Sequence, residues 1–247
     1  MFDAVTQAFK IPDLRRKIFF TLGILVLFRI IASIPVPGVN RAGLADYIQG
    51  NQLLGMLNLF SGSGLRNFSI VALGVYPYIT ASIIMQLLTP VIPRLNELSN
   101  EGQQGRNKIN QYTHFLTVPL ALLQGYGQAL LFSRTSVGGQ PLLTDFGLFH
   151  RDTFLPSAAL LLTMTAGTML LVWMGELITE YGIGNGVSII IFGGIVASLP
   201  KAVGSLLTSG STSQNLIGTV FFALIALGTV VGIVYINEGQ RRIPVHY

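Results

Sequence analysis

The chain has 247 residues, of which 51% are hydrophobic and 10% are charged, and its formal net charge is +5. The charges cluster between long apolar runs, which argues against a soluble domain and is typical of a polytopic helical membrane protein. The excess of Lys and Arg fits cytoplasmic loops better than a nucleic-acid-binding surface, and the absence of cysteine excludes disulfides, thiolate metal sites and a Cys nucleophile.

Residues 1–17 are predicted to form an amphipathic helix on the cytoplasmic membrane surface, because apolar residues at helical spacing lead into three consecutive basic residues. A basic cluster before an apolar run could also open a cleaved signal peptide. The run from 18 to 34 is longer than a usual signal-peptide core, however, and continues to Pro35 and Pro37. We therefore expect a retained first span over about 18–36.

Arg29 lies inside this first span. A central Arg costs about 2.5–3.5 kcal/mol on insertion scales, so its side chain is expected to face protein, water or the far interface. A structural contact with a carbonyl or a loop carboxylate is favoured over a transport role, because the sequence has no second charge at membrane depth.

The next apolar segment, over about 53–65, is too short to cross a bilayer and is predicted to be re-entrant. The glycine-rich residues 61–64 allow a sharp reversal into the following helix. A half-inserted element that leads into a polar helix looks like a lid beside a channel wall.

That helix, the predicted second span over about 69–92, is long and apolar enough to cross a bilayer but contains many polar residues, glycines and prolines. These interruptions suggest that protein or a water-filled cavity lies beside it. They are Gly74, Pro77, Thr80, Ser82, Gln86, Thr89 and Pro90.

Four branched or aliphatic residues of this span, Val75, Ile79, Ile83 and Leu87, are each four apart and form one stripe. Two interpretations stay open from the spacing alone. The stripe packs against other helices of a bundle, or it forms a hydrophobic constriction that blocks small solutes by dewetting.

Residues 94–111 are hydrophilic and predicted to be a solvated cytoplasmic loop. A third span follows over about 112–132 and a fourth over about 154–174, which ends near Trp173, an interfacial residue type.

Glu176 and Glu180 precede a glycine-rich turn, and they lack the partner residues that acid/base chemistry would need. The fifth span, about 183–200, is short and broken by glycines. Residues 201–236 contain a loop outside and the sixth span, and residues 237–247 begin a cytoplasmic loop. Six crossings from a cytoplasmic N-terminus place nine Lys or Arg residues inside, five outside and Arg29 within the membrane, as the positive-inside rule prefers.

In combination, these features resemble the SecY family, the central subunit of the bacterial protein-conducting channel. The resemblance extends over nearly the whole chain. It rests on IPVPG at 34–38, NLFSGSGL at 58–65, LGVYPYITASIIMQLL at 73–88, EGQQGRNKINQYT at 101–113, ITEYGIGNGVSIIIFGGIVASLP at 178–200 and GQRRIPVHY at 239–247.

The resemblance implies an all-α membrane fold: the first five-helix half of a ten-helix channel built as an inverted repeat, the sixth helix, and a short re-entrant plug. The implied function is to move secretory polypeptides across the membrane and to release membrane segments laterally into it. The family fold continues beyond the sixth helix, so we expect this chain to be an N-terminal fragment or to be completed by another chain.

The resemblance also assigns site residues. The pore ring would include Val75, Ile79 and Ile191, and Val75 stands where many members have Ile, which should leave the seal slightly wider. The lateral gate would include Thr80, Ile83, Ile84 and Leu87, and the plug Leu53, Leu54, Met56, Leu57, Asn58, Leu59 and Phe60.

The implied partners are SecE-like and SecG-like subunits, the SecA motor or the ribosome, a secretory precursor with its signal sequence, and the lipid bilayer. Arg241 and Arg242 are candidates for contact with ribosomal RNA or SecA, although ordinary positive-inside charge explains them as well. The expected location is the bacterial cytoplasmic membrane. No cofactor, metal or catalytic residue is expected.

Two other classes of membrane protein share some of these features. A secondary transporter would also have broken helices, but it usually needs a coupling-ion or substrate site, and only Arg29 is charged at depth. An intramembrane enzyme is less favoured. The sequence has no HExxH motif, its three histidines, including His114, are expected in or near loops, and Ser188 has no membrane-embedded histidine to activate it.

Overall fold

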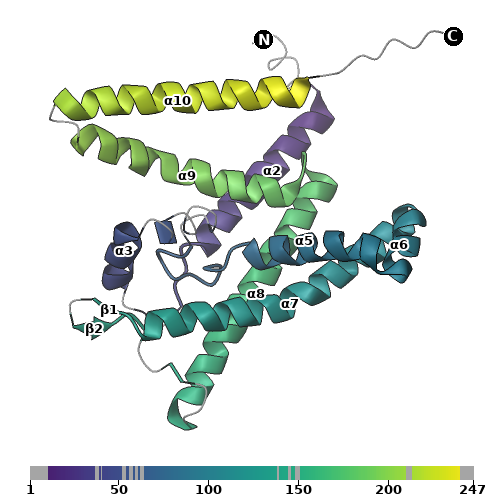
Figure 1. Cartoon of the computed structure of the whole chain (residues 1–247), viewed down its shortest axis with the longest axis horizontal. Helices are drawn as coiled ribbons and strands as arrows, with labels where there is room; N and C mark the ends of the chain where they lie inside the picture. Colours follow the sequence, from purple (N-terminus) through teal and green to yellow (C-terminus); the bar gives the residue numbers. More distant parts are fainter. Residues whose placement is uncertain are drawn as a thin grey trace. The chain divides into compact units, whose positions relative to one another are not determined.

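The computed structural model describes residues 11–36, 39, 41–51, 54–55, 58, 61, 64–137, 139–143, 146–147, 151–209 and 213–239. It is all-α, as predicted, apart from a hairpin of two two-residue strands. The chain divides into two units, Met1–Ser198 and Leu199–Tyr247. The elements in chain order are α2 (Pro12–Ile31), α3 (Arg41–Gly50), α5 (Tyr76–Val91), α6 (Pro93–Asn100), α7 (Gln103–Ser133), β1 (Ser136–Val137), β2 (Gln140–Pro141), α8 (Arg151–Tyr181), α9 (Gly186–Ser209) and α10 (Ser213–Glu238) (Figure 1).

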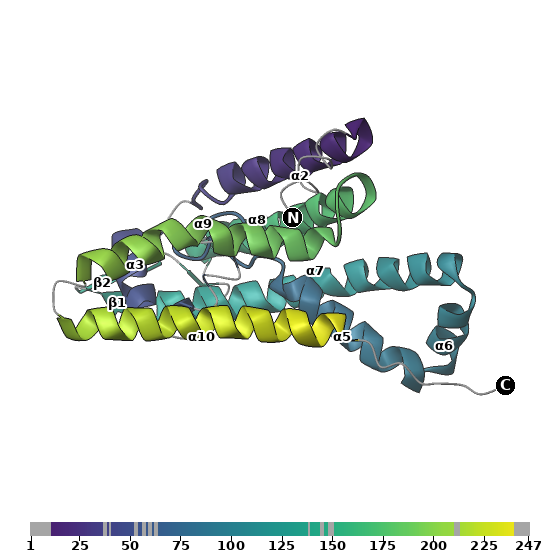
Figure 2. The same ribbon diagram turned by 90° about the horizontal axis from the view of Figure 1, so that it is seen from above.

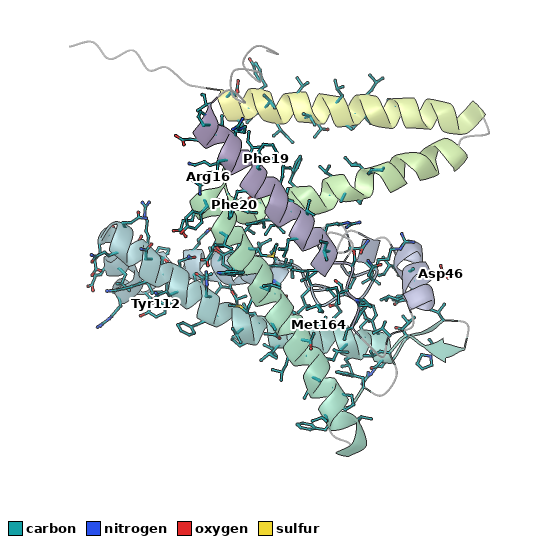
Figure 3. All side chains as sticks on the ribbon, turned by 180° about the vertical axis from the view of Figure 1, so that it is seen from behind. Arg16, Phe19, Phe20, Asp46, Tyr112 and Met164 are labelled. Atoms are coloured by element: carbon teal, nitrogen blue, oxygen red, sulfur yellow. The ribbon has the colours of Figure 1, made fainter. Side chains whose placement is uncertain are left out.

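Helix α2 begins earlier than the predicted first span. Pro12 occupies its first turn, where proline is favoured because no intrahelical N–H is needed. The helix then continues through the basic cluster of residues 15–17 without a break, so no helix end falls at residue 17. Phe19 and Phe20, which extend from α2 in Figure 3, are exposed, whereas Phe28 is buried.

The predicted second span differs most from the structure. Residues 64–75 form consecutive turns, and α5 begins only at Tyr76, with Pro77 in its first turn. The turns pair with the end of the first span: Val36 N–H donates to the Phe68 carbonyl at 2.9 Å, and Ile70 N–H donates to the Ile34 carbonyl at 3.2 Å. Buried backbone groups need such partners, which explains how a non-helical segment is tolerated here.

Helix α5 ends at a bend of 99° into α6. Ile92 between the two helices is extended, as the residue before a proline prefers, and Pro93 opens α6. Gly102, with φ of 77°, then reverses the chain into α7, so α7 lies beside α5 with α6 at one end (Figure 2). The predicted loop at 94–111 is therefore wrong in part, because α6 and the first turns of α7 are helical there.

Close contacts at glycines fix α8 in place. A Cβ on Gly167 of α8 would collide with the backbone carbonyl of Ile70, and one on Gly186 at the start of α9 would collide with the carbonyl of Gly175. These helices therefore approach other backbone segments more closely than any side chain would allow.

Two clusters of buried side chains form the core of the first unit. The Phe68 cluster joins α3, the turns, α7, the hairpin region and α8, and includes Met164 of α8 (Figure 3). Its members are Val36, Leu44, Ile48, Leu65, Phe68, Ala72, Ala129, Phe132, Leu142, Leu143, Leu160, Leu161 and Met164. The Val75 cluster joins α2, the turns, α8 and α9, and its members are Phe28, Ala32, Val71, Val75, Leu171, Met174, Ile178 and Ile190.

By length and composition, two described helical stretches could cross a membrane: Gln103–Ser133 and Thr153–Tyr181. They contain the residues predicted for the third and fourth spans, 112–132 and 154–174, and extend beyond them. The bent pair α5 and α6 adds a third if it counts as one span. Helix α9 continues through Pro200, where the fifth span was predicted to end, and in the second unit most described side chains of α10 are exposed.

Candidate functional site

The structure brings the three predicted pore-ring residues to one place. Val75 directly precedes α5 and belongs to the Val75 cluster. Ile79, whose N–H donates to the Val75 carbonyl at 3.1 Å, and Ile191 of α9 both pack against the same cluster. Residues more than a hundred positions apart therefore share one aliphatic surface, and their role around a pore stays a prediction.

The three residues differ in exposure. Val75 is only 2% exposed because other residues of the described chain cover it, whereas Ile79 and Ile191 are half-buried. Only the latter two present part of their surface outside the cluster. The two isoleucines are thus better placed than Val75 to meet another molecule.

Only the first half of the α5 stripe is packed: Val75 and Ile79 belong to or contact the Val75 cluster, whereas Ile83 and Leu87 are largely uncovered. The buried residues of α5 are Pro77, Ala81 and Met85, on another face of the helix, which packs against α7. Ile83 and Leu87 are 51% and 66% exposed. The bundle-packing interpretation is therefore wrong for Ile83 and Leu87 within the described residues.

The predicted lateral-gate residues lie along this less covered side. Thr80 is half-buried and its hydroxyl donates to the Tyr76 carbonyl at 3.1 Å, which satisfies the polar group within the helix. Ile84 is also half-buried. With Ile83 and Leu87 they form a surface that the described part of the chain does not cover.

Polar residues of α5 do face a cavity, as their presence in a span suggested. Ser82, Gln86 and Thr89 line a pocket of about 450 Å³ between α5, α6 and α7. The other lining residues are Met85, Ser99, Arg106, Ile109, Asn110 and Thr113.

Of the predicted plug, Leu54 and Asn58 are described, and Leu53, Met56, Leu57, Leu59 and Phe60 lie outside the described residues. The Asn58 side-chain oxygen accepts the N–H of Arg66 at 2.9 Å, and the Ser61 hydroxyl oxygen accepts the N–H of Leu65 at 3.0 Å. These two bonds fasten the end of the segment predicted to be re-entrant to the turns that lead into α5.

A second pocket, of about 260 Å³, separates this segment from α7. Leu54, Ser61 and Leu65 line one side, and Gln124 and Gln128 are on the α7 side. The side-chain oxygens of the two glutamines are buried, with no hydrogen-bond partner among the described residues. The other lining residues are Ala72, Leu73, Tyr76, Gly127 and Leu131.

A polar cluster that sequence reasoning missed joins α5, α7 and α8. One carboxylate oxygen of Glu176 lies 3.0 Å from His114 Nε2 and accepts a hydrogen bond from the Asn110 amide at 3.1 Å. The Tyr78 hydroxyl reaches Asn110 Oδ1 at 3.5 Å, and the Tyr78 ring meets the His114 ring edge to face at 5.7 Å.

The expectation that His114 lies in or near a loop is wrong, because α7 begins at Gln103 and includes it. Asn110 and His114 are four apart on one helix, a spacing that could have signalled a shared polar face. Their partners on α5 and α8 could not be identified from that spacing.

Some predicted features fall on residues that the structure does not describe. Arg241 and Arg242 lie outside the described residues, as does the segment before residue 11. Within the part of the chain that the structure describes, no group of three or more His, Cys, Asp or Glu side chains could hold a metal ion.

A family model and individual relatives both place the chain with the same family of proteins. The SecY family model matches residues 69–247. The chain is 46% identical to the protein translocase subunit SecY of Streptomyces galbus and 46% identical to that of Corynebacterium glutamicum, over 100% and 99% of its length. It spans 57% and 55% of these two relatives, so it corresponds to little more than half of their length.

Two solved structures share the fold. A protein-conducting channel superposes with a TM-score of 0.56 at 19% identity, over 90% of this chain and 51% of that one. Sec61 in the canine ribosome–channel complex from the endoplasmic reticulum gives a TM-score of 0.51 at 18% identity, over 98% and 54%. At these identities the likeness concerns the fold alone.

Proposed function

Because the chain belongs to the SecY family, we propose that it forms part of a protein-conducting channel, which moves secretory polypeptides across a membrane and releases apolar segments laterally into the bilayer. The observation that carries the proposal is the 46% identity, over the whole chain, to proteins named protein translocase subunit SecY. The remaining length of those relatives corresponds to the other half of the channel.

In this proposal, Ile79 and Ile191, with Val75 behind them, form one side of a constriction. Branched apolar side chains can surround an extended polypeptide without offering fixed hydrogen-bond partners, so they tolerate any sequence and resist ions when the channel is empty. Their common position on the Val75 cluster supports this role.

The segment 53–65 acts as the plug, and the face of α5 that carries Thr80, Ile83, Ile84 and Leu87 acts as one side of the lateral gate. The high exposure of Ile83 and Leu87 supports the gate role, because a gate needs an apolar surface that another helix can cover and leave. A signal sequence, itself an apolar helix, would occupy this surface on its way into lipid.

The proposed location is the bacterial cytoplasmic membrane, with the N-terminus inside. The partners would be SecE-like and SecG-like subunits, a precursor polypeptide, and the ribosome or the SecA motor at Arg241 and Arg242. The likeness to Sec61 in a ribosome–channel complex supports a ribosome contact. The proposed spans are those predicted from the sequence, with the second beginning in the turns before α5.

The test is site-specific crosslinking in membranes with the full-length protein from the source gene. A photoreactive residue replaces Ile79 or Ile191, and a stalled secretory precursor occupies the channel. The matched control is the same residue at Leu123 of α7, which is 68% exposed. We expect adducts with the precursor at both isoleucines and none at Leu123.

Equal adducts at all three positions, or none, would contradict the channel. If a small solute protected Ile79 and Ile191 while no precursor ever crosslinked, the secondary transporter would replace the channel as the best interpretation.

A further inference from the structure

Glu176 of α8 contacts side chains of α7 that lead to α5, the helix that carries Ile79. Its carboxylate oxygen accepts a hydrogen bond from the Asn110 amide and lies 3.0 Å from His114 Nε2, and these two residues stand one turn apart on α7. Both of these residues meet Tyr78, the residue directly before Ile79 on α5. The carboxylate is therefore linked to the start of α5 through two side chains of α7.

The backbone beside Glu176 is fixed to the start of α9. The N–H of Gly186 donates to the Thr179 hydroxyl at 2.9 Å, and that hydroxyl donates to the carbonyl of Gly175 at 3.0 Å. A Cβ on Gly186 would collide with the carbonyl of Gly175, and one on Gly175 would crowd Val187. Any movement of Glu176 must therefore be shared by the first turn of α9.

The first turns of α9 continue this connection into the constriction. The Asn185 side chain accepts the N–H of Ser188 at 3.1 Å and caps the helix, and the residues that follow, Val187, Ile189 and Ile191, pack against the Val75 cluster. Ile79 packs against the same cluster from α5.

From these contacts we propose that Glu176 is a positioning residue: by holding Asn110, His114 and Tyr78, it sets the separation of α5 from the start of α9 and so the width of the constriction between Ile79 and Ile191. This inference rests on the proposed channel function. Glu176 touches neither isoleucine in this role and acts through the helices that carry them.

The position of the cluster suits such a role. The Glu176 side chain is 41% exposed and that of His114 is 24% exposed, so the described residues cover the carboxylate on one side only. A partly hydrated contact is less costly to break than a fully buried one, so it can open when a polypeptide parts the helices.

The test uses the full-length protein in its membrane complex, reconstituted in phospholipid vesicles. Cysteines replace two exposed residues, Leu88 of α5 and Phe192 of α9, and carry spin labels whose separation is measured. The 247 residues contain no cysteine of their own, so this part of the chain adds no further labelled site. Ion conductance of the empty complex is measured on the same preparations.

We expect Glu176→Ala to shift or broaden the label separation by about 1–2 Å, the size of ordinary helix shifts. Conductance should rise at least about fivefold, the lower end of usual coupling between linked sites. Glu176→Gln keeps an oxygen that can accept from Asn110, so the label separation should stay close to that of the unsubstituted protein. This variant also tests the inference if Glu176→Ala does not fold. Asn110→Ala should change the separation in the same direction, because Asn110 links Glu176 to Tyr78 of α5.

The matched control is Glu180→Ala, one turn further along α8 and also exposed. An unchanged label separation in Glu176→Ala, or the same change in Glu180→Ala, would overturn the inference. Adducts of the precursor at Ile79 with an unchanged separation would leave the channel standing and remove only the role of Glu176. A changed separation without any precursor adduct would leave the helix contact standing and remove the channel.

Discussion

The Phe68 cluster and the Val75 cluster share α8 and the turns before α5, and they differ in the contacts that hold them. In the Phe68 cluster, Phe132 meets Phe68 at 5.6 Å and Tyr47 at 6.5 Å, both edge to face, and α3 and the hairpin region cover it. Such aromatic pairs have a preferred geometry and contribute about 0.5–1.5 kcal/mol beyond the area they bury. The packing of this cluster therefore depends on the orientation of its rings as well as on how well its side chains fill space.

The Val75 cluster has one aromatic member, Phe28, and its other members are aliphatic residues, an alanine and a methionine. Aliphatic contacts are not directional, so helices packed through them can separate and repack without losing a specific partner. From this difference we expect the surface shared by α2, α8 and α9 to separate more readily than the region around Phe132.

The largest expected effect is at Phe132. Replacing it with alanine removes both ring contacts of a fully buried side chain, so we expect a loss of about 3–5 kcal/mol in the free energy of unfolding. The measurement is SDS-induced unfolding of the full-length protein in mixed micelles. Leu131→Ala, at the 45% exposed neighbour, is the control and should cost far less. Equal losses would mean that the aromatic contacts do not distinguish this cluster.

A smaller effect is expected where the two clusters meet. Ile70, which Gly167 touches, lies between Phe68 of one cluster and Val71 of the other. Gly167→Ala must displace α8 from the turns, and we expect a cost of about 1–3 kcal/mol, as for other overpacked sites. The same unfolding measurement applies.

Gly127→Ala is the matched control for this change. Gly127 has no other atom within 4 Å of an added Cβ, so alanine should stabilise its helix by up to about 1 kcal/mol. Opposite signs for the two substitutions would support the close approach at Gly167, and a stabilising Gly167→Ala would contradict it.

The regular helices could be predicted from the sequence because their length and hydropathy suffice. α7 and α8 contain the predicted third and fourth spans, and Pro119 does not break α7. The start of α5 could not be predicted in this way. Residues 69–75 are as apolar as the helix that follows them. Their turns are paired by hydrogen bonds with residues 34–36, and no local sequence pattern reveals that pairing.

The candidate site shows the same division. The four-residue spacing predicted a stripe on α5, but not that Ile83 and Leu87 would be left uncovered while Ala81 and Met85 pack. The polar cluster of Tyr78, Asn110, His114 and Glu176 draws its members from three helices, so no local sequence pattern could have predicted it. The bend of 99° after α5, where Pro93 begins a new helix, was not predicted, because the hydrophilic sequence there indicates a solvated loop.

Two adjacent isoleucines of α9 can separate packing from the proposed seal. Ile190 is 2% exposed in the Val75 cluster, and Ile191 is half-buried beside it. Ile190→Val should cost about 1 kcal/mol of stability, the usual effect of one lost buried methylene, and should leave ion conductance of the empty channel unchanged.

Ile191→Val should cost less stability than Ile190→Val and should raise that conductance, because it removes the same methylene from the proposed constriction. Both variants are measured in the full-length complex in vesicles, by unfolding and by conductance. A rise for Ile190→Val instead would place the seal on the other face of α9.

The most local effect is expected at the fastening of the predicted plug. Asn58→Ala removes the acceptor for the Arg66 N–H, a bond of 2.9 Å, and we expect a local loss of about 1 kcal/mol, which is about a fivefold faster hydrogen exchange of the Arg66 amide. Asn58→Asp keeps the accepting oxygen and should restore the slow exchange. If the plug is released through this contact, only the alanine variant should also shorten the time that the channel stays closed. Faster exchange in both variants would mean that the amide end of Asn58, and not its oxygen, holds the segment in place.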